Sequence, residues 1–258
     1  MPCLQCNALL FLYINNNMLR VHSYESMGTH DGPGLRLVVF VQGCRFNCLY
    51  CANPDTISTV GGKDTSIDEI IRMAISQKAF FGKKGGVTVS GGEPTLQASA
   101  LKHLFKRLKE EGINTCLDTN GNNMNDDVRE LLEYTDLVLL DIKHMDPDQH
   151  RVITGRGVEN TLRFADYLRE KGIPVWLRYV LVPGLSDQPE ALKQLGEHFK
   201  DFENIQRLEI LPYHTLGKHK YEHMGRAYKL EDTPNNTEEQ LVFAKELLTP
   251  YFKYVQVN

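Results

Sequence analysis

Segments typical of strands and helices alternate six times along this 258-residue chain, and this alternation constrains the fold more than any other feature. Runs rich in Val, Ile and Leu predict strands at residues 35–41, 86–90, 113–119, 137–140, 174–182 and 205–211. Amphipathic segments follow them, and two of these begin at Ser66 and Thr237 with the spacing of a capping box. Regular alternation of this kind requires parallel strands joined by right-handed crossovers.

The expected fold class is α/β, a single domain built as an incomplete (β/α)6 TIM-like barrel of parallel strands. Six units are too few for the closed eightfold barrel, so an open doubly wound sheet is the alternative. Ligands of a doubly wound sheet meet mainly its switch point, whereas here every predicted strand is followed by a reactive or glycine-rich group. These groups are Cys44, Gly91, Asp118, Asp141, Arg178 and His214. Their distribution favours the barrel.

Composition excludes several classes of function. The net charge of -4 gives no basic field for nucleic acid, and no apolar run approaches the roughly 18 residues of a membrane span. Six cysteines, three of them clustered, indicate a metal site in a reducing compartment, so a cytoplasmic location is expected. Residues 1–17 lack the basic start of a signal peptide. We expect them to be a disordered extension or the product of an upstream start, with the working domain at residues 18–258.

Three cysteines, Cys44, Cys48 and Cys51, fall within the segment 43–53 with the spacing C-x3-C-x2-C. This cysteine loop follows the first predicted strand and ends at a turn, Asn53-Pro54. It is therefore expected at the carboxyl end of a strand, where α/β proteins place their chemistry.

Thiolates bind zinc or iron–sulfur clusters, and the number of cysteines separates the two. A structural zinc site needs four ligands, and a site that paired Cys3 and Cys6 with the last two loop cysteines would leave Cys44 unused. Its halves would also lie further apart than the roughly 15–20 residues typical of such sites. Cys116 falls in the middle of a predicted strand and is expected to be a small buried residue. Three thiolates on a 4Fe-4S cluster leave one iron open to a small chelating molecule.

The cysteine loop, with Tyr50 before its last cysteine, resembles the C-x3-C-x-aromatic-C motif of the radical S-adenosylmethionine superfamily. The span from Val21 to Val257 is similar to one family within it, the activating enzymes of glycyl-radical enzymes, and most similar to those that activate pyruvate formate-lyase. Residues 53–65 contain no second cysteine cluster, which favours that branch. The other motifs that carry the likeness are Asp31-Gly-Pro-Gly-Leu-Arg36, Ser90-Gly-Gly-Glu-Pro94, Leu117-Asp-Thr-Asn-Gly121, Asp141-Ile-Lys143, Arg178-Tyr179, Val182-Pro-Gly184, Leu211-Pro-Tyr-His214 and Leu216-Gly-Lys-His-Lys220.

The resemblance implies a reaction and its partners. A 4Fe-4S cluster on Cys44, Cys48 and Cys51 binds S-adenosyl-L-methionine, whose reductive cleavage yields a 5′-deoxyadenosyl radical. That radical takes a hydrogen atom from a glycine of pyruvate formate-lyase. The implied electron donor is flavodoxin or ferredoxin, and the chain is expected to act as a monomer without nucleic acid or membrane. The alternatives are another small enzyme of the superfamily, such as an anaerobic ribonucleotide reductase activase, or a non-enzymatic iron–sulfur or zinc protein.

The resemblance also assigns site residues. The implied contacts to S-adenosylmethionine are Tyr50, Cys51, Ala52, Gly91, Gly92, Glu93, Asp141, Ile142, Lys143 and His214. The implied ligands of a monovalent cation, Na+ or K+, are Asp118, Thr119, Asp141 and the carbonyl of Leu139. Asp31 and Arg178 are implied to face the protein substrate. Many relatives have His where this chain has Ala52, so a side-chain contact from that position is lost.

The residues alone also allow simpler interpretations. The glycine pair after the second strand fits a tight turn, and the Gly-Pro-Gly motif fits an ordinary one. Asp118 is consistent with a turn cap, and Asp141 with an ion pair to Lys143. His219 and His223 lack a third ligand at suitable spacing, which favours a solvated segment over a second metal site.

Overall fold

Nine strands form one continuous sheet in residues 17–258, the part of the chain that the computed structural model describes. They are β1 (Met18–Gly28), β2 (Arg36–Val41), β3 (Lys63–Ser66), β4 (Gly86–Gly91), β5 (Asn114–Thr119), β6 (Leu137–Asp141), β7 (Val175–Leu181), β8 (Ile205–Pro212) and β9 (Val255–Val257). The expected N-terminal extension, apart from residue 17, lies outside the described residues, and so do Cys3 and Cys6.

Helices connect most of the strands. They are α2 (Ile67–Phe81), α3 (Ala98–Glu110), α4 (Asp126–Leu132), α5 (Pro147–Thr154), α6 (Glu159–Lys171), α7 (Pro189–Phe199), α8 (Lys218–His223) and α9 (Glu238–Leu248). Three short 3-10 helices are η1 (Pro54–Thr56), η2 (Pro94–Gln97) and η3 (Thr249–Tyr251). Within residues 17–258, no helix is both long enough and apolar enough to cross a membrane.

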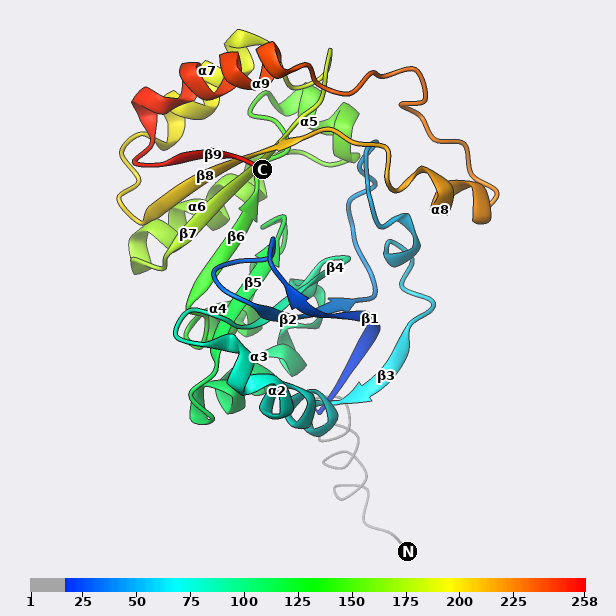
Figure 1. The fold of residues 1–258 in the computed structure, drawn as a ribbon, viewed down its shortest axis with the longest axis vertical. Coiled ribbons are helices and arrows are strands. Elements are labelled where there is room, and N and C mark those ends of the chain that lie inside the picture. The colour runs from blue at the N-terminus through cyan, green and yellow to red at the C-terminus, as the bar shows by residue number, and fades with distance from the viewer. Residues whose placement is uncertain (1–16) are drawn as a thin grey trace, which may run out of the picture.

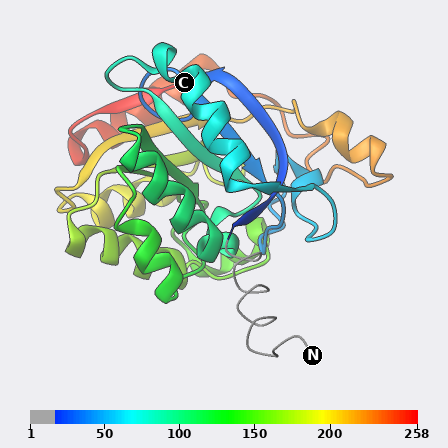
Figure 2. The ribbon, with the colours of Figure 1, turned by 90° about the horizontal axis from the view of Figure 1, so that it is seen from below.

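The strands follow the order β3-β1-β2-β4-β5-β6-β7-β8-β9, and neighbours from β2 onward are parallel. The helices that connect the parallel strands lie along the outside of the curved sheet (Figures 1 and 2). The edge strands β3 and β9 do not pair with each other, so the barrel stays open. The prediction of an incomplete parallel barrel in one domain is confirmed, with its six repeating strands at β2, β4, β5, β6, β7 and β8.

The two faces of the sheet differ in character because side chains alternate along each strand. Leu117 and Leu140 are buried in the large apolar core that the sheet shares with the helices. On the inner face, Cys116, Leu139 and Trp176 form a smaller apolar cluster, so Cys116 is the buried residue that the sequence predicted. Toward the carboxyl ends of the strands the inner face becomes polar. This change from apolar to polar positions the site at that end of the barrel.

Local sequence explains where two helices begin. Ser66 Oγ accepts a hydrogen bond from the amide of Glu69 at 3.2 Å, at the start of α2. Thr237 and Gln240 form the reciprocal capping box that the sequence predicts for α9, with distances of 3.3 and 2.9 Å. These side chains satisfy amides that the first turn of a helix leaves without partners.

The prediction that all strands are parallel is wrong at one edge of the sheet. Strand β1 pairs antiparallel with both β2 and β3. Neither β1 nor β3 was predicted, because β1 mixes polar and apolar residues and β3 is the four-residue segment Lys-Asp-Thr-Ser. Strand β3 is the edge of the sheet and β1 lies next to it, and many residues of both strands are exposed or half-buried, so neither strand has the continuous apolar pattern of the central strands.

Two helices were also missed. Helix α5 begins with Asp146 as its N-cap and Pro147 at its first position, and the Asp146 side chain accepts hydrogen bonds from the amides of Asp148 and Gln149 at 3.0 and 2.9 Å. This is a recognisable start signal that the sequence did contain. Helix α8 lies within the polar segment 215–234 and buries only Tyr221, so no helical period marks it.

Candidate active site

A cavity of about 610 Å³ opens at the carboxyl ends of the parallel strands. The predicted site residues that line it are Asp31, Cys44, Cys48, Tyr50, Cys51, Ala52, Gly91, Gly92, Asp118, Thr119, Asp141, Lys143, Arg178 and His214. Glu93, Leu139 and Ile142 are buried and are not among the lining residues. Folding therefore brings most of the predicted residues together, while these three lie in the layer behind the wall.

The cysteine loop is held at its start and in its middle by backbone hydrogen bonds. The amide of Cys44 donates to the carbonyl of Ile57, just beyond η1, at 3.0 Å. The amides of Asn47 and Leu49 donate to the last two carbonyls of α5 at 2.8 and 2.9 Å. Because the final carbonyls of a helix have no partners within the helix, the loop completes α5 while α5 fixes the loop.

The three loop thiols are free and partly buried. Burial, assisted by nearby Glu93, raises the pKa of Cys44 to about 12. Burial also raises the pKa of Cys48 to about 12, and it raises the pKa of Cys51. The sulfur of Cys44 accepts from the amide of Phe46 at 3.4 Å. Thiols with such pKa values are neutral near pH 7 and must lose their protons when they bind a metal.

The donor set of the loop fits a cluster better than a single ion. Within residues 17–258, no three His, Cys, Asp or Glu side chains converge closely enough to hold one metal ion. The remaining described cysteine, Cys116, is buried in the inner apolar cluster and is not in the cavity wall. Three thiols without a fourth ligand match a 4Fe-4S cluster with one open iron, whereas a closed zinc site needs four ligands.

The glycine pair at the end of β4 is required by close packing against the end of β2 and the start of the cysteine loop. Gly91 has φ of +108°, and a Cβ there would lie 2.4 Å from the amide nitrogen of Val41. A Cβ on Gly92 would lie 2.2 Å from the carbonyl oxygen of Gly43. The tight-turn interpretation is therefore confirmed, and the same absence of side chains leaves this stretch of backbone open to the cavity.

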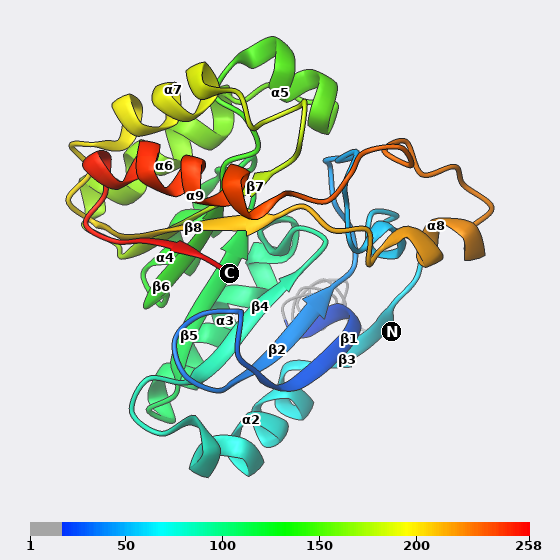
Figure 3. The same ribbon diagram turned by 45° about the horizontal axis from the view of Figure 1, so that its top comes forward.

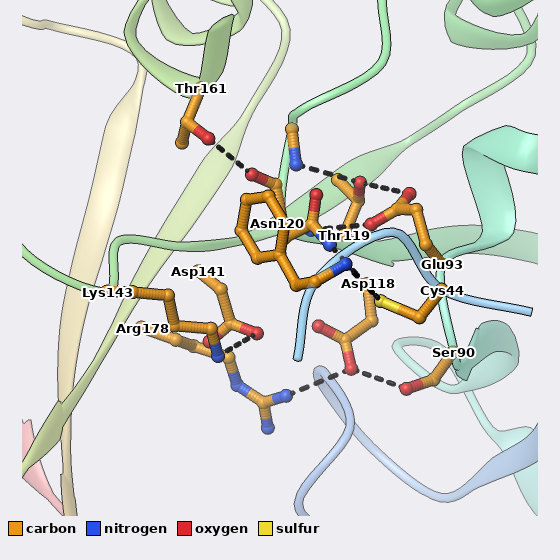
Figure 4. A network of polar contacts seen from close by, with 12 residues as sticks. Cys44, Ser90, Glu93, Asp118, Thr119, Asn120, Asp141, Lys143, Thr161 and Arg178 are labelled. Atoms are coloured by element: carbon orange, nitrogen blue, oxygen red, sulfur yellow. Dashed lines mark hydrogen bonds and ion pairs between the residues drawn. The ribbon is translucent and has the colours of Figure 1, made fainter. Parts of the chain in front are cut away.

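Glu93 is a buried structural carboxylate. It accepts hydrogen bonds from the Thr95 hydroxyl at 2.6 Å. It also accepts from the Thr119 hydroxyl at 2.6 Å and from the backbone amide of Asn120 at 2.9 Å (Figure 4). Burial raises the pKa of Glu93, and these donors act in the opposite direction. Its side chain joins the turn after β4 to the end of β5.

A charged network covers the inner face between β4 and β8, and Figure 4 shows its part from Ser90 to Arg178. One carboxylate oxygen of Asp118 accepts from Ser90 Oγ at 2.6 Å and from Arg178 Nη1 at 3.3 Å. Arg178 Nε donates to Glu209 at 3.3 Å, and its Nη2 donates to the carbonyl of His30. Burial raises the pKa of Asp118 to about 6, although Arg178 acts to lower it. The other oxygen of Asp118, Oδ1, is buried without a hydrogen-bond partner among the described residues.

Lys143 and Asp141 form an ion pair in the cavity wall, with the ammonium 2.9 Å from the carboxylate. The ammonium also lies 5.6 Å from the centre of the Tyr50 ring. Burial works against the charge of Lys143, but Asp141 and Tyr50 outweigh it and hold the pKa of Lys143 well above its ordinary value. The simpler interpretation of this pair is therefore confirmed, and the ion pair holds the ammonium of Lys143 in the cavity wall.

The remaining predicted residues lie around the mouth. His214 is exposed, and its Nδ1 accepts from the amide of Leu216 at 3.3 Å. Ala52 packs against Gly217, where a Cβ would lie only 2.8 Å from the Ala52 Cα. His219 and His223 are exposed on α8 and are not among the lining residues, as expected of a solvated segment.

Sequence reasoning missed two functional neighbours of the predicted residues. The side-chain amide of Asn120 donates to the sulfur of Cys44 at 3.8 Å. Asn120 belongs to the motif at residues 117–121, but the sequence alone predicted no role for it. Glu209 is a carboxylate in the middle of the apolar strand β8, with 2% of its surface exposed. A carboxylate between the apolar residues Leu208 and Ile210 of a predicted strand is the signal that would have identified Glu209, because a buried charge needs a partner.

Residues 38–195 match the family model of the radical SAM superfamily, so the chain belongs to that superfamily. The chain is 46% identical over 235 residues to the pyruvate formate-lyase 1-activating enzyme of Escherichia coli strain K12, which covers 90% of this chain and 96% of that protein. It is 48% identical over 220 residues to the pyruvate formate-lyase-activating enzyme of Staphylococcus aureus strain USA300, which covers 82% and 88%. Within the superfamily, the chain therefore belongs to the family of pyruvate formate-lyase activating enzymes.

Solved structures share the fold. A domain of pyruvate-formate lyase-activating enzyme from Bacteroides vulgatus superposes with a TM-score of 0.58 at 24% identity, covering 67% of this chain and 99% of that one. Streptococcus suis SuiB bound to the precursor peptide SuiA superposes with a TM-score of 0.66 at 18% identity, covering 87% of this chain and 49% of that one. At these identities the likeness shows a common architecture alone.

Proposed function

We propose that this chain activates pyruvate formate-lyase by generating a glycyl radical on it. The observation that carries the proposal is the set of three free thiols on one loop, without a fourth ligand among the described residues, in the wall of a cavity of about 610 Å³. A 4Fe-4S cluster at such a loop supplies the reductive cleavage of S-adenosylmethionine and the radical that removes hydrogen from a substrate glycine. Membership of the family of activating enzymes supports this assignment.

Cys44, Cys48 and Cys51 would hold the cluster as thiolates, after they lose the protons that burial keeps on them. The Asn120 amide lies beside one of these sulfurs, and hydrogen bonds to ligand sulfurs tune the potential of an iron–sulfur centre. Holding the loop by the carbonyls of α5 keeps the three sulfurs in a fixed arrangement before metal binds.

The opposite wall would bind the polar end of the cofactor. Lys143 provides a positive charge for a carboxylate, and Asp141 fixes its direction. The unpartnered Oδ1 of Asp118, the Asp141 carboxylate and the carbonyls of Thr119 and Leu139 would supply oxygens to a monovalent cation. The hydroxyl of Thr119 is already bonded to Glu93, so its carbonyl is the group available.

Backbone and aromatic groups would complete the cofactor site. The bare backbone at Gly91 and Gly92 can approach a cofactor amine. Tyr50 and Ala52 flank the last cysteine in the same wall, and His214 stands at the mouth. Glu93 and Ile142 act from behind the wall: the first joins the glycine turn to β5, and the second is buried in the core.

Asp31 and Arg178 would face the backbone of the protein substrate. Both line the cavity, and Arg178 is held by Asp118, Glu209 and the carbonyl of His30. Its direction is therefore set before the substrate arrives, which lowers the cost of ordering the complex. The open side of the barrel gives a peptide segment a way in.

The partners follow from the chemistry. The protein substrate is pyruvate formate-lyase, and the electron comes from a low-potential carrier such as flavodoxin or ferredoxin, because the cluster must be reduced to act. The enzyme works as a monomer in the cytoplasm, where its thiols stay reduced.

Anaerobic reconstitution tests the proposal. We expect about four irons per chain, dithionite-dependent formation of 5′-deoxyadenosine, and a glycyl-radical EPR signal on added pyruvate formate-lyase. A colourless protein that contains zinc would exclude both the proposed activity and the alternative, an activase of anaerobic ribonucleotide reductase. 5′-Deoxyadenosine without the EPR signal on pyruvate formate-lyase, but with one on an anaerobic ribonucleotide reductase, would favour the other activase.

A further inference from the structure

We infer that an acidic one-electron carrier protein docks on the side of the cysteine loop that faces away from the cavity. The inference rests on the proposed function, since it takes the loop to hold a reducible cluster. The docking site is a cluster of four exposed arginines, here called the arginine surface. Its members are Arg45, Arg151, Arg156 and Arg163.

The arginine surface surrounds a second cavity of about 530 Å³. Its arginines come from three segments: the cysteine loop, α5 with the turn after it, and α6. Figure 3 shows α5 and α6 at one end of the molecule, far from α2. Glu159 is the one acidic residue among the residues that line this cavity in the described part of the chain. Because the chain has a net charge of -4, this local excess of positive charge does not follow from a basic composition.

Most of this positive charge is not neutralised within residues 17–258. Arg151 pairs with Asp148 at 3.3 Å and Glu159 at 3.7 Å. Arg156 donates to the carbonyl of Arg45 at 3.4 Å. Arg163 donates to Asn160 at 2.6 Å, and Arg45 has no ion pair among the described residues. Three of the four guanidinium groups therefore have no carboxylate partner there.

The arginine surface is built directly on the loop that carries the thiols. Arg45 follows Cys44 in the chain, and Arg156 is bonded to the Arg45 carbonyl. The two cavities share no lining residue. A protein seated on the arginine surface would thus approach the cluster from one side and leave the main cavity open to the cofactor and the protein substrate.

The chemistry of the surface favours an acidic protein over a small anion. All four arginine side chains are exposed, and they are spread over three segments, as is expected of a surface that binds another protein. The N-terminus of α6 adds partial positive charge, because its N-cap Val158 provides no side-chain acceptor. Guanidinium groups pair well with carboxylates, and complementary charge steers fast, transient encounters of the kind that redox partners make. In such an encounter the carrier gives up one electron, the cluster gains it, and no atom is transferred.

The double variant Arg156→Glu/Arg163→Glu tests the inference, with oxidised flavodoxin as the probe and calorimetry as the binding measurement. We expect Kd for flavodoxin to rise at least about tenfold at low ionic strength, and the salt dependence of Kd to flatten. Arg72→Glu makes half of this change of charge, at an exposed position on α2, and is expected to leave Kd unchanged. Binding is measured without turnover, so this result does not depend on the proposed function.

Measurements of turnover with two different reductants separate electron delivery from the cleavage of S-adenosylmethionine. In the reconstituted double variant, flavodoxin-driven formation of 5′-deoxyadenosine should fall about tenfold, while the dithionite-driven rate should stay at the wild-type value. Unchanged flavodoxin binding, equal weakening by Arg72→Glu, or binding of inorganic phosphate in place of flavodoxin would each overturn the inference. So would parallel loss of both rates in the double variant and in its milder form, Arg156→Gln/Arg163→Gln. If wild type makes no 5′-deoxyadenosine with dithionite, the proposed function fails, and the binding measurement still decides the docking surface.

Discussion

Arginines lie on both sides of the cysteine loop, but their charges are balanced in different ways. In the cavity, Arg178 is 9% exposed and is held between Asp118 and Glu209. On the arginine surface, Arg45 and Arg163 are exposed and have no carboxylate partner among the described residues. A buried charge must be compensated within the chain, whereas an exposed charge is compensated by water and can wait for a partner. The difference fits the roles proposed above, in which Arg178 stabilises the fold and faces the protein substrate, and the arginine surface binds a partner protein.

Arg36 shows a third way to balance a guanidinium. It is fully buried at the other end of the inner face, and it donates to neutral oxygens of Thr88, Pro33 and Asn114 at 2.6, 3.0 and 2.9 Å. Burial lowers the pKa of Arg36. Because its partners carry no charge, Arg36 joins strands β2, β4 and β5 without a titrating group.

The largest effect is expected for Arg178→Met. This change leaves the buried carboxylate of Asp118 without its cation and leaves Glu209 with Arg207 alone, so the free energy of unfolding should fall by about 3–5 kcal/mol. Urea unfolding of the metal-free protein measures it. The matched control is Arg163→Met on the arginine surface, which should change stability by no more than about 0.5 kcal/mol. Equal losses of stability in Arg178→Met and Arg163→Met would show that burial does not distinguish the cavity arginine from those of the arginine surface.

A smaller effect is expected for Glu209→Gln. The glutamine keeps the shape of the side chain but removes the charge that meets Arg178 and Arg207, so stability should fall by about 2 kcal/mol. Glu203→Gln, at an exposed position, is the control and should be nearly neutral. In the active enzyme, KM for pyruvate formate-lyase should rise more than kcat falls, since Glu209 orients Arg178 and does not touch reacting atoms. A pure loss of kcat would contradict that role.

A change of about 1 kcal/mol is expected for Gly217→Ala. The added Cβ would meet the backbone of Ala52, and near the surface the segment before α8 can shift to relieve the overlap. Hydrogen exchange should then become faster in residues 52–56, which Lys220 also contacts through Asn53 at 2.8 Å and Asp55 at 3.2 Å. Gly225→Ala is a useful contrast: no heavy atom lies near its added Cβ, but φ is +64°, so its cost would come from backbone strain alone. Unchanged exchange in Gly217→Ala would mean that the contact does not order the loop.

The central strands and the cysteine loop were predictable because their signals are local. Apolar runs and the cysteine spacing are read within a few residues, and parallel strands bring their carboxyl ends to one edge without further information. The role of Glu93 was not predictable, since its partners Thr95, Thr119 and Asn120 meet it only after folding. The arginine surface was hidden for the same reason: its four members are scattered between residues 45 and 163 of a chain whose net charge is negative.

The smallest expected effect is a pH dependence of stability that comes from His150. This residue lies between Phe46, in the wall of the main cavity, and Arg156 of the arginine surface. Its ring packs edge-on against Phe46 with centroids 5.5 Å apart, and its Nδ1 is 2.7 Å from the carbonyl of Arg156. Its Nε2 is buried without a partner among the described residues. Burial lowers the pKa of His150, so the unfolded chain, with an ordinary histidine pKa of about 6.5, binds a proton more readily than the folded one.

The sign of the effect follows from this order of pKa values. The contribution of His150 to stability is constant above about pH 7 and falls as the pH drops through about 6.5, because protons then favour the unfolded chain. His150→Gln should reduce the loss of stability between pH 7.5 and pH 5.5 in urea unfolding. His144, whose pKa is also lowered by burial, should account for part of the remainder. The arginine surface cannot contribute, since guanidinium groups stay charged throughout this range. An unchanged pH slope in His150→Gln would show that His150 is accommodated equally well in its charged form, and would place its ring in contact with water.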